Sequence, residues 1–277
     1  MKKKKRVALL WYLLIALALV VFLFPVYWMM VSSFEPNSAL MSLPPKFWPK
    51  ELFLENYKVI LNNAKYLVYF KNSVIVASLS MFFSIAMSLF AGYAFSRFYF
   101  PCKSAFMTVI MNIQIFPVTV ITISLFTFYS KMGLMNTYRG LVLANIIYSL
   151  PFTVWFIKAF FDTVPISLDE SARIDGCGRM KTMLLVIMPL LKPGIIAIGI
   201  YTFLYSWDDF LFALTIMKTE SMKTLPLGIA QSFIGEFAQD YAGMMTLSVI
   251  ASIPVVIAFM LTQKYMVGGL VNGAVKG

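Results

Sequence analysis

The chain has 277 residues, of which 60% are hydrophobic and 13% charged, and its formal net charge is +11. Soluble domains are roughly 45–50% apolar, so this composition, with a mean hydropathy of +0.82, predicts a multispanning membrane protein. The basic residues flank apolar runs and form no patch with stacking aromatic residues, which argues against a nucleic-acid partner. Since the chain has no histidine, histidine-based metal sites, proton relays and catalytic triads are excluded.

Apolar runs long enough to cross a bilayer occur six times, which predicts an all-α fold with six transmembrane helices. The predicted spans cover residues 7–33, 66–96, 104–129, 140–161, 184–214 and 243–266. Three prolines lie inside these runs, and each removes a backbone donor from its helix. Pro117, Pro151 and Pro189 therefore predict breaks in spans three, four and five, as expected of helices that line a cavity.

The orientation follows from the basic cluster at residues 2–6, which directly precedes the first span. Such a cluster is typical of a cytoplasmic terminus. Six spans return the C-terminus to the same side, so the chain divides into a cytoplasmic N-terminus (1–6), a membrane domain (7–266) and a cytoplasmic tail (267–277). The connection at about 162–183 is then cytoplasmic as well, and Cys102 and Cys177 lie in cytoplasmic loops.

A charged stretch within this connection has the pattern of a short capped helix. Ser167 and Glu170 have the spacing of a capping box. Asp169 falls in the first turn, where the helix dipole favours an anion, and Gly176 suits a left-handed stop. Asp175 is the exception, because it places an anion near the unfavourable end. The pattern fits either a solvated loop helix or a docking helix for another protein.

Polar residues within the predicted spans are candidates for a transport path. An ionisable group deep in hydrocarbon costs about 2.5–3.5 kcal/mol on insertion scales, so such groups face protein or water. Hydrogen bonds between helices explain the amides equally well, whereas two adjacent aspartates favour a water-filled path or a gate. The candidate residues are Asn112, Gln114, Asn145, Tyr148, Trp207, Asp208 and Asp209.

Enzyme machinery is missing from the sequence. There is no glycine-rich phosphate loop, no metal-ligand spacing and no base placed for a nucleophile. We therefore expect no cofactor and no metal, and the chain cannot use ATP by itself. Energy for uphill transport would come from an ion gradient or from another protein.

From Glu170 onward the sequence resembles the signature loop of bacterial ATP-binding-cassette importer permeases. That pattern is Glu-Ala-Ala, three residues, Gly, nine residues and Ile-x-Leu-Pro. The matching positions are Glu170, Ser171, Ala172, Gly176 and residues 186–189. The departures are serine for alanine at 171, valine for isoleucine at 186 and methionine for leucine at 188.

Further segments resemble the maltose-type sugar importers, and within them the permease with the shorter N-terminal region. They are residues 92–97, 150–155, 203–212, 224–228 and 273–277. The resemblance implies a subunit of the bacterial inner membrane that pairs with a homologous second permease in the lipid bilayer. It also implies two cytoplasmic ATPase subunits and an extracytoplasmic sugar-binding protein as partners.

The resemblance also implies roles for particular residues. The signature loop would form a coupling helix between spans four and five that docks on the ATPase, where Glu170 would meet a basic residue. The implied coupling residues are Ser167, Asp169, Glu170, Ser171, Ala172, Asp175 and Gly176. The end of the tail would contact the ATPase pair through Gly273, Ala274, Val275, Lys276 and Gly277. Residues 207–210 would lie near the translocation path.

Other functions remain open at this point. A permease of the same family could import a solute other than a sugar, such as glycerol phosphate. An ion-coupled secondary transporter would use Asp208 and Asp209 as cation or proton sites, but it would be expected to show inverted repeats, which are not evident. A membrane enzyme fits less well, since the sequence shows no nucleophile–base pair. A scaffold also fits less well, since it would not need paired aspartates in its spans.

Overall fold

The computed structural model describes residues 2–44, 47–49, 51–233 and 240–274, with the side chains of 2–9 and 264–274 outside the description. Every regular element among these residues is helical, as the composition predicts. The chain forms two compact units. Unit 1 comprises Met1–Leu67 and Ile229–Ile253, and unit 2 comprises Val68–Gly228 and Pro254–Gly277.

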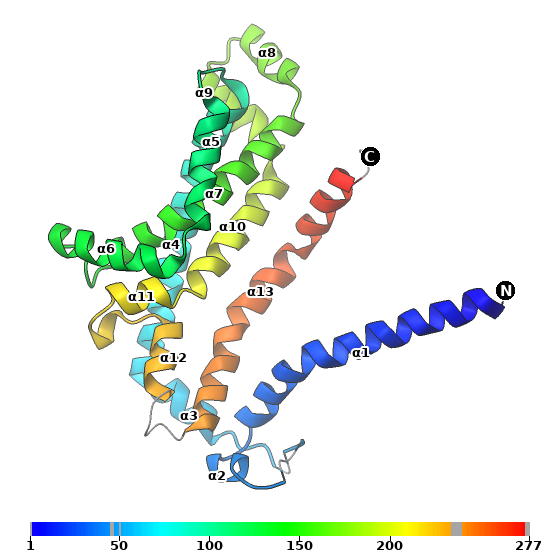
Figure 1. Cartoon of the computed structure of the whole chain (residues 1–277), viewed down its shortest axis with the longest axis vertical. Coiled ribbons are helices and arrows are strands. Elements are labelled where there is room, and N and C mark those ends of the chain that lie inside the picture. Colours follow the sequence, from blue (N-terminus) through cyan, green and yellow to red (C-terminus); the bar gives the residue numbers. More distant parts are fainter. Residues whose placement is uncertain (1, 45–46, 50, 234–239, 275–277) are drawn as a thin grey trace. The chain divides into compact units, whose positions relative to one another are not determined.

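The helices follow one another with short connections (Figure 1). In chain order they are α1 (Lys2–Ser33), α2 (Asn37–Leu40), α3 (Glu55–Asn62), α4 (Ala64–Arg97), α5 (Lys103–Asn112), η1 (Ile113–Ile115), α6 (Val118–Met132), α7 (Tyr138–Thr163), α8 (Ile166–Ile174), α9 (Arg179–Lys181), η2 (Thr182–Ile187), α10 (Lys192–Trp207), α11 (Leu211–Ile216), η3 (Glu220–Met222), α12 (Leu225–Phe233) and α13 (Tyr241–Ala274). The segments η1 and η3 are 3₁₀ turns, and η2 is a π-helix.

Four helices of the described residues are long and apolar enough to cross a membrane: α1, α4, α7 and α13. They correspond to the first, second, fourth and sixth predicted spans. The third and fifth predicted spans are bent pairs, with α5–η1 and α6 at 96° and α9–η2 and α10 at 89°. The chain therefore has four to six candidate spans, and this supports a polytopic membrane protein.

The prolines explain two of the three predicted breaks. Pro117 stands between η1 and α6 with an extended backbone, and Pro189 lies in the turn that separates η2 from α10. Pro193 occupies the first turn of α10, where its missing N–H costs nothing. The predicted break at Pro151 is wrong, because α7 continues through it. Packing of α7 against its neighbours holds the helix together despite the lost hydrogen bond, since Pro151 itself is buried.

Unit 1 is built around the end of α1. The Ser33 hydroxyl lies 2.7 Å from the Tyr57 hydroxyl of α3, and the Ser33 carbonyl accepts hydrogen bonds from Asn56 and Thr246. Phe34 stacks on Tyr57 with ring centroids 5.1 Å apart. These contacts join α1, α3 and the start of α13. The helix α3 lies in the connection after the first predicted span.

Unit 2 has two apolar clusters that lie along α7. The first joins α7 to α4, α6 and α11 and includes Leu141 and Phe212. The second joins α7 to α4, η2 and α10 and includes Tyr93, Phe161 and Ile187. Both clusters consist of apolar side chains, and because lipid tails are as apolar as these side chains, close van der Waals packing holds the clusters together. The second cluster ends at Val164, where α8 begins, and it forms the base on which α8 rests.

Candidate coupling site

The helix α8 begins two residues earlier than a capping box at Ser167 would allow. Its N-cap is Pro165, whose carbonyl accepts a hydrogen bond from the Leu168 N–H at 3.2 Å, and no side chain caps it. Ser167 therefore lies inside the first turn instead of at the N-cap, and the predicted pairing of Ser167 with Glu170 is wrong. The fixed φ of Pro165 sets the start of the helix instead.

The C-terminal end of α8 is a Schellman motif, as Gly176 predicts. Gly176 has a φ of +80° and donates to the Arg173 carbonyl at 3.0 Å. The Cys177 N–H donates to the Ala172 carbonyl at 2.8 Å. These two bonds satisfy the last carbonyls of the helix. A Cβ at position 176 would meet no atom within 4 Å, so a larger residue there would be disfavoured by backbone strain alone.

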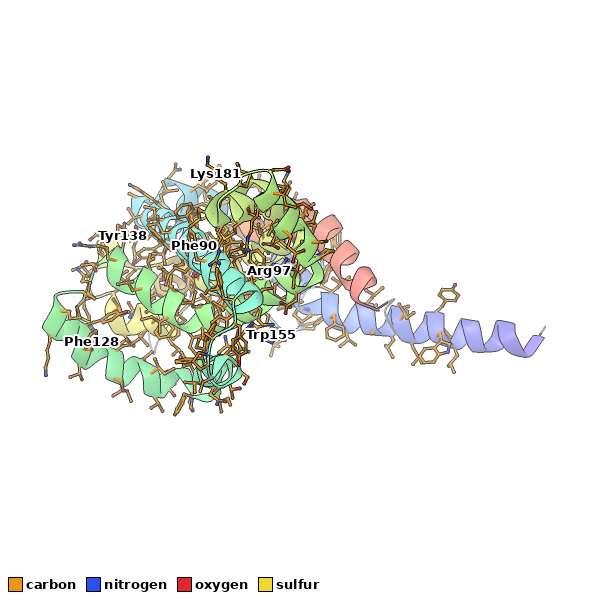
Figure 2. The ribbon with its side chains drawn as sticks, turned by 90° about the horizontal axis from the view of Figure 1, so that it is seen from above. Phe90, Arg97, Phe128, Tyr138, Trp155 and Lys181 are labelled. Carbon is orange, nitrogen blue, oxygen red and sulfur yellow. The ribbon has the colours of Figure 1, made fainter. Side chains whose placement is uncertain are left out.

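One face of α8 is buried, and its central residue is Asp169. The Asp169 carboxylate lies 2.9 Å from Arg97 Nε and accepts a hydrogen bond from the Tyr93 hydroxyl at 3.1 Å. Arg97 also donates through Nη2 to the Val164 carbonyl at 2.8 Å. Arg97, labelled in Figure 2, is the last residue of α4. We call Tyr93, Arg97 and Asp169 the clamp.

The clamp is an almost fully desolvated ion pair. The side chains of Arg97 and Asp169 are only 8% and 6% exposed. Nε and Oδ2 approach off the N–H direction, so this contact is electrostatic and not a hydrogen bond. Removing one partner of a buried pair typically costs about 3–5 kcal/mol, because it leaves an uncompensated charge. The clamp thus ties α8 to α4 by a contact that tolerates no one-sided loss.

Contacts around the clamp hold the neighbouring segments in place. The Asp162 carboxylate at the end of α7 accepts from the Ser96 hydroxyl at 2.6 Å and pairs with Lys158 at 2.5 Å. The Arg179 guanidinium lies 4.8 Å from the centre of the Phe98 ring. Gly92 lets α4 approach α7, since a Cβ there would lie 2.8 Å from Ile157 Cγ2.

The opposite face of α8 is exposed. Ile166 is 61% exposed and Ile174 is 87% exposed, and Glu170 stands between them at i, i+4 spacing on the same face. Asp175 is exposed beyond them. Across the described part of the chain, no ion-pair partner faces Glu170 or Asp175. An almost fully exposed isoleucine beside a carboxylate without an ion-pair partner is typical of a surface that contacts another protein.

Among the polar residues of the spans, Asp209 has a structural position. Its carboxylate accepts hydrogen bonds from the Phe212 and Ala213 N–H groups, both at 3.1 Å, and a further one from the Asn145 side chain. Asp209 thereby satisfies the free donors at the start of α11. Asp208 is exposed beside it. The two adjacent aspartates therefore have different surroundings, which residue type alone could not distinguish.

The remaining candidates separate into two groups. The Gln114 amide donates to the Tyr148 carbonyl at 3.3 Å, and the Tyr148 ring stacks on Tyr205 with centroids 5.4 Å apart. Trp207 is buried and packs edge-on against Phe70 at 5.5 Å. Asn112 is exposed at the end of α5 and makes no contact with them that the structure records. Gln114 and Tyr148 lie together, whereas Asn112 does not join them.

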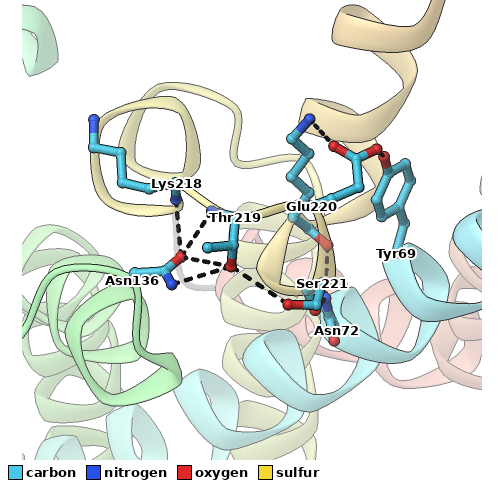
Figure 3. Close-up of polar contacts among 8 residues, drawn as sticks. Tyr69, Asn72, Asn136, Lys218, Thr219, Glu220 and Ser221 are labelled. Carbon is cyan, nitrogen blue, oxygen red and sulfur yellow. Dashed lines mark hydrogen bonds and ion pairs between the residues drawn. The ribbon is translucent and has the colours of Figure 1, made fainter.

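A second polar network, which the sequence did not reveal, lies at the other end of α4 (Figure 3). Asn72 is buried and donates to the carbonyls of Ser221 and Lys223 at 3.0 and 2.8 Å. Asn136 accepts from the N–H groups of Lys218 and Thr219 at 2.9 and 3.1 Å. For Asn72, the available signal was an amide inside an apolar run. For Asn136, it was the tolerance of asparagine for positive φ, and its φ is 56°.

The tail residues carry less information. Gly273 and Ala274 belong to the last turn of α13. Val275, Lys276 and Gly277 lie outside the described residues. The predicted contact of the tail with an ATPase stays a prediction.

Comparison with known proteins identifies the family. The model of the family described as "Binding-protein-dependent transport system inner membrane component" matches residues 84–271, which is more than half of the chain. The chain belongs to this family. Members of this permease family are transport components and not enzymes, in agreement with the absence of catalytic motifs.

The permease has relatives over nearly its whole length. The trehalose/maltose transport system permease protein MalG of Thermococcus litoralis is 35% identical over 262 residues, which cover 93% of each chain. A bacterial ABC transporter that imports the acidic polysaccharide alginate has a chain with a TM-score of 0.84 at 18% identity, covering 96% of this chain and 98% of that one. A bacterial alginate ABC transporter in complex with an alginate pentasaccharide-bound periplasmic protein gives a TM-score of 0.67 at 18% identity, with 95% and 96% covered. These two structures share the fold.

Proposed function

We propose that the chain is one of two permease halves of an ATP-driven carbohydrate importer in a bacterial inner membrane. Family membership supports the binding-protein-dependent mode of transport over the ion-coupled alternative. The relative from Thermococcus litoralis is named for trehalose and maltose, and the alginate importer carries a polysaccharide. These names support a carbohydrate as the solute. Counting each bent helix pair as one span supports six spans, and we propose that both termini lie in the cytoplasm.

The exposed face of α8 carries the proposal that this segment, at about residues 165–179, couples to an ATPase. Ile166 and Ile174 are 61% and 87% exposed on the same face, and apolar side chains grouped on a surface outside the bilayer support a protein partner. Glu170 lies between them without a partner in the described residues and would pair with a basic group of the ATPase. The buried face of the same helix is bound to this chain through Asp169 and Ala172. One helix thus faces its own chain on one side and is open on the other.

The partners follow from this arrangement. A second, homologous permease would complete the pathway, because one chain forms half of it. Two ATPase subunits would bind the α8 faces of the two permeases, and a sugar-binding protein would deliver the solute on the outer side. ATP binding would move α8 and switch the pathway between inward and outward access. This is alternating access driven by the partner ATPase subunits.

The proposed path residues have unequal support. Gln114 and Tyr148 lie together and Asp208 is exposed, so these three are the better candidates for contact with the solute. Asp209, Asn145 and Trp207 are engaged in packing and capping. We expect the first group to affect transport kinetics and the second to affect folding.

The test uses the assembled importer with its ATPase. Glu170→Lys should abolish ATPase association and uptake, because it reverses a charge on the exposed face of α8. Gly176→Asp should weaken both, since a φ of +80° costs a β-carbon-bearing residue up to about 1–2 kcal/mol and the substitution adds an anion at the Schellman end. Co-purification with the ATPase and uptake by membrane vesicles measure both effects.

The control is Gly178→Asp. It adds the same charge two residues away, where the φ of −69° is ordinary and a Cβ would meet no atom within 4 Å. We expect Gly178→Asp to retain association. If Glu170→Lys inserts normally and keeps both the ATPase and uptake, α8 is not the docking helix.

A further inference from the structure

We propose that Arg97 is a positioning residue for coupling, because it makes α4 move together with α8. The inference rests on the proposed docking role of α8. It adds a third mechanical connection to the two that the chain provides, which are α7 before α8 and η2 with α10 after it. Motion imposed on α8 then reaches α4 directly through the clamp.

The joints on either side of α8 show why a third connection matters. Before α8 the backbone is extended at Val164 and Pro165, and after it the chain turns through Gly176 and Gly178. A helix of nine residues between two such joints can rotate about the line that connects them. Asp169 lies near the middle of α8, away from both joints, so its contact with Arg97 stops that rotation. With this third contact, a force on α8 moves the attached helices instead of rotating α8 alone.

The geometry of Arg97 fits this task better than a stabilising role alone. The guanidinium contacts Asp169 in the middle of α8 and also the Val164 carbonyl at the joint before it. Its planar fork fixes both directions at once, which a lysine ammonium cannot do. Replacing a buried ion pair by apolar groups of similar volume is often neutral or favourable for stability. The buried pair of Arg97 and Asp169 therefore serves to fix the orientation of α8 relative to α4.

The route continues along α4. This helix has 34 residues and so spans about 50 Å. Near its other end, Asn72 holds the carbonyls of Ser221 and Lys223, and the Ser73 hydroxyl accepts from the Leu225 N–H at 2.8 Å. The clamp thus links α8 to the loop at residues 219–225 through one continuous helix.

The test compares stimulated with basal ATP hydrolysis in the reconstituted importer, with uptake measured per assembled complex. Arg97→Ala should lower the stimulation by binding protein and sugar by at least about fivefold, the lower end of typical coupling between sites. Uptake should fall by the same factor while complexes still contain the ATPase. Arg97→Lys, which keeps the charge and loses the fork, should lie between Arg97→Ala and the native protein.

A double variant separates positioning from stability. Arg97→Ala with Asp169→Ala leaves no unpaired buried charge, so it should insert better than Arg97→Ala alone. If the clamp positions α8, this double variant stays uncoupled although it assembles. If it regains full stimulation and uptake, Arg97 serves stability only and the proposal is wrong.

The control variant is Lys158→Ala, which removes a cation at the same end of the molecule from the half-exposed pair with Asp162. We expect it to leave stimulation and uptake unchanged. Equal losses in Lys158→Ala and Arg97→Ala would overturn the assignment to the clamp. The two proposals can fail separately: if Glu170→Lys keeps the ATPase, the docking role fails, whereas normal coupling in the Arg97 variants with docking intact refutes the clamp alone.

Discussion

The two ends of α4 bind their neighbours in different ways. At its N-terminal end, Asn72 and Ser73 hold main-chain groups of the loop at 219–225 by neutral hydrogen bonds, and the Tyr69 hydroxyl donates to the Glu220 carboxylate of the same loop. At its C-terminal end, Arg97 and Tyr93 hold a side chain of α8, and the contact is a buried ion pair. Several main-chain bonds fix the shape of a segment, whereas one side-chain contact fixes its position and leaves the rest of its surface free.

This difference suits the two segments. The backbone of the loop at 219–225 is held directly, because Asn72, Ser73 and Asn136 together engage four of its backbone groups. The helix α8 satisfies its own backbone through its hydrogen bonds and the Schellman end. Its connection to α4 can then rest on Asp169, and Glu170 and Ile174 remain exposed for a partner.

The largest expected loss of stability among the remaining tests comes from Asn72→Ala. It removes two donors and the acceptor that Tyr138 reaches at 2.6 Å, all in a residue only 1% exposed. Each buried polar group left unpaired costs about 1–3 kcal/mol, so we expect a large drop in the thermal midpoint in detergent. Ser221→Ala is the control, since it keeps the carbonyl that Asn72 binds. Equal stability of Asn72→Ala and the control would show that this network is replaceable by water.

At the other end of α4, Gly92→Ala should be less damaging. Its Cβ would lie 2.8 Å from Ile157 Cγ2 and 3.1 Å from the Lys158 nitrogen. Overpacking of this kind typically costs about 1–3 kcal/mol. Thermal unfolding of the single and double variants measures the effect. Adding Ile157→Ala should relieve part of the clash, so the double variant should lose less stability than the two single variants together. Strictly additive losses would contradict close packing of α4 on α7.

The smallest expected effect comes from Asn136→Gly, because Asn136 is partly exposed. Asn136→Gly keeps access to the φ of 56° but loses the side-chain acceptor, and Asn136→Ala loses both. We expect about 1 kcal/mol from the hydrogen bonds and a further 1–2 kcal/mol from the strain of alanine. Hydrogen exchange of the Lys218 and Thr219 amides measures the first part directly. Unchanged exchange in Asn136→Gly would mean that the loop holds its shape without this side chain.

Much of the architecture could be predicted from the sequence because it depends on local patterns. Apolar runs locate the spans, and Gly176 locates the end of α8 by its conformational freedom. The start of α8 was mispredicted because Ser167 and Glu170 matched a spacing, while Pro165 had already set the first turn. Pro151 was mispredicted as a break because tertiary packing around a buried proline is invisible in a periodicity.

The clamp could not be predicted for a different reason. Asp169 was expected to respond to the dipole of its own helix, yet its partner Arg97 is separated from it by α5, α6 and α7. Residues 92–97 drew attention only as part of a family resemblance. A pairing of this kind depends on how helices pack, and one sequence contains no signal for which cation reaches which carboxylate.

The π-helix at Thr182–Ile187 gives the spacing of the signature loop a physical meaning. A π-turn holds one residue more than an α-turn, and each residue of an α-helix advances about 100° around its axis. The number of residues within η2 therefore sets the angle, around the axis of this segment, between the side chains before it and those after it. Removing a single residue from η2 would change that angle by about 100° while every side chain before and after it stays the same.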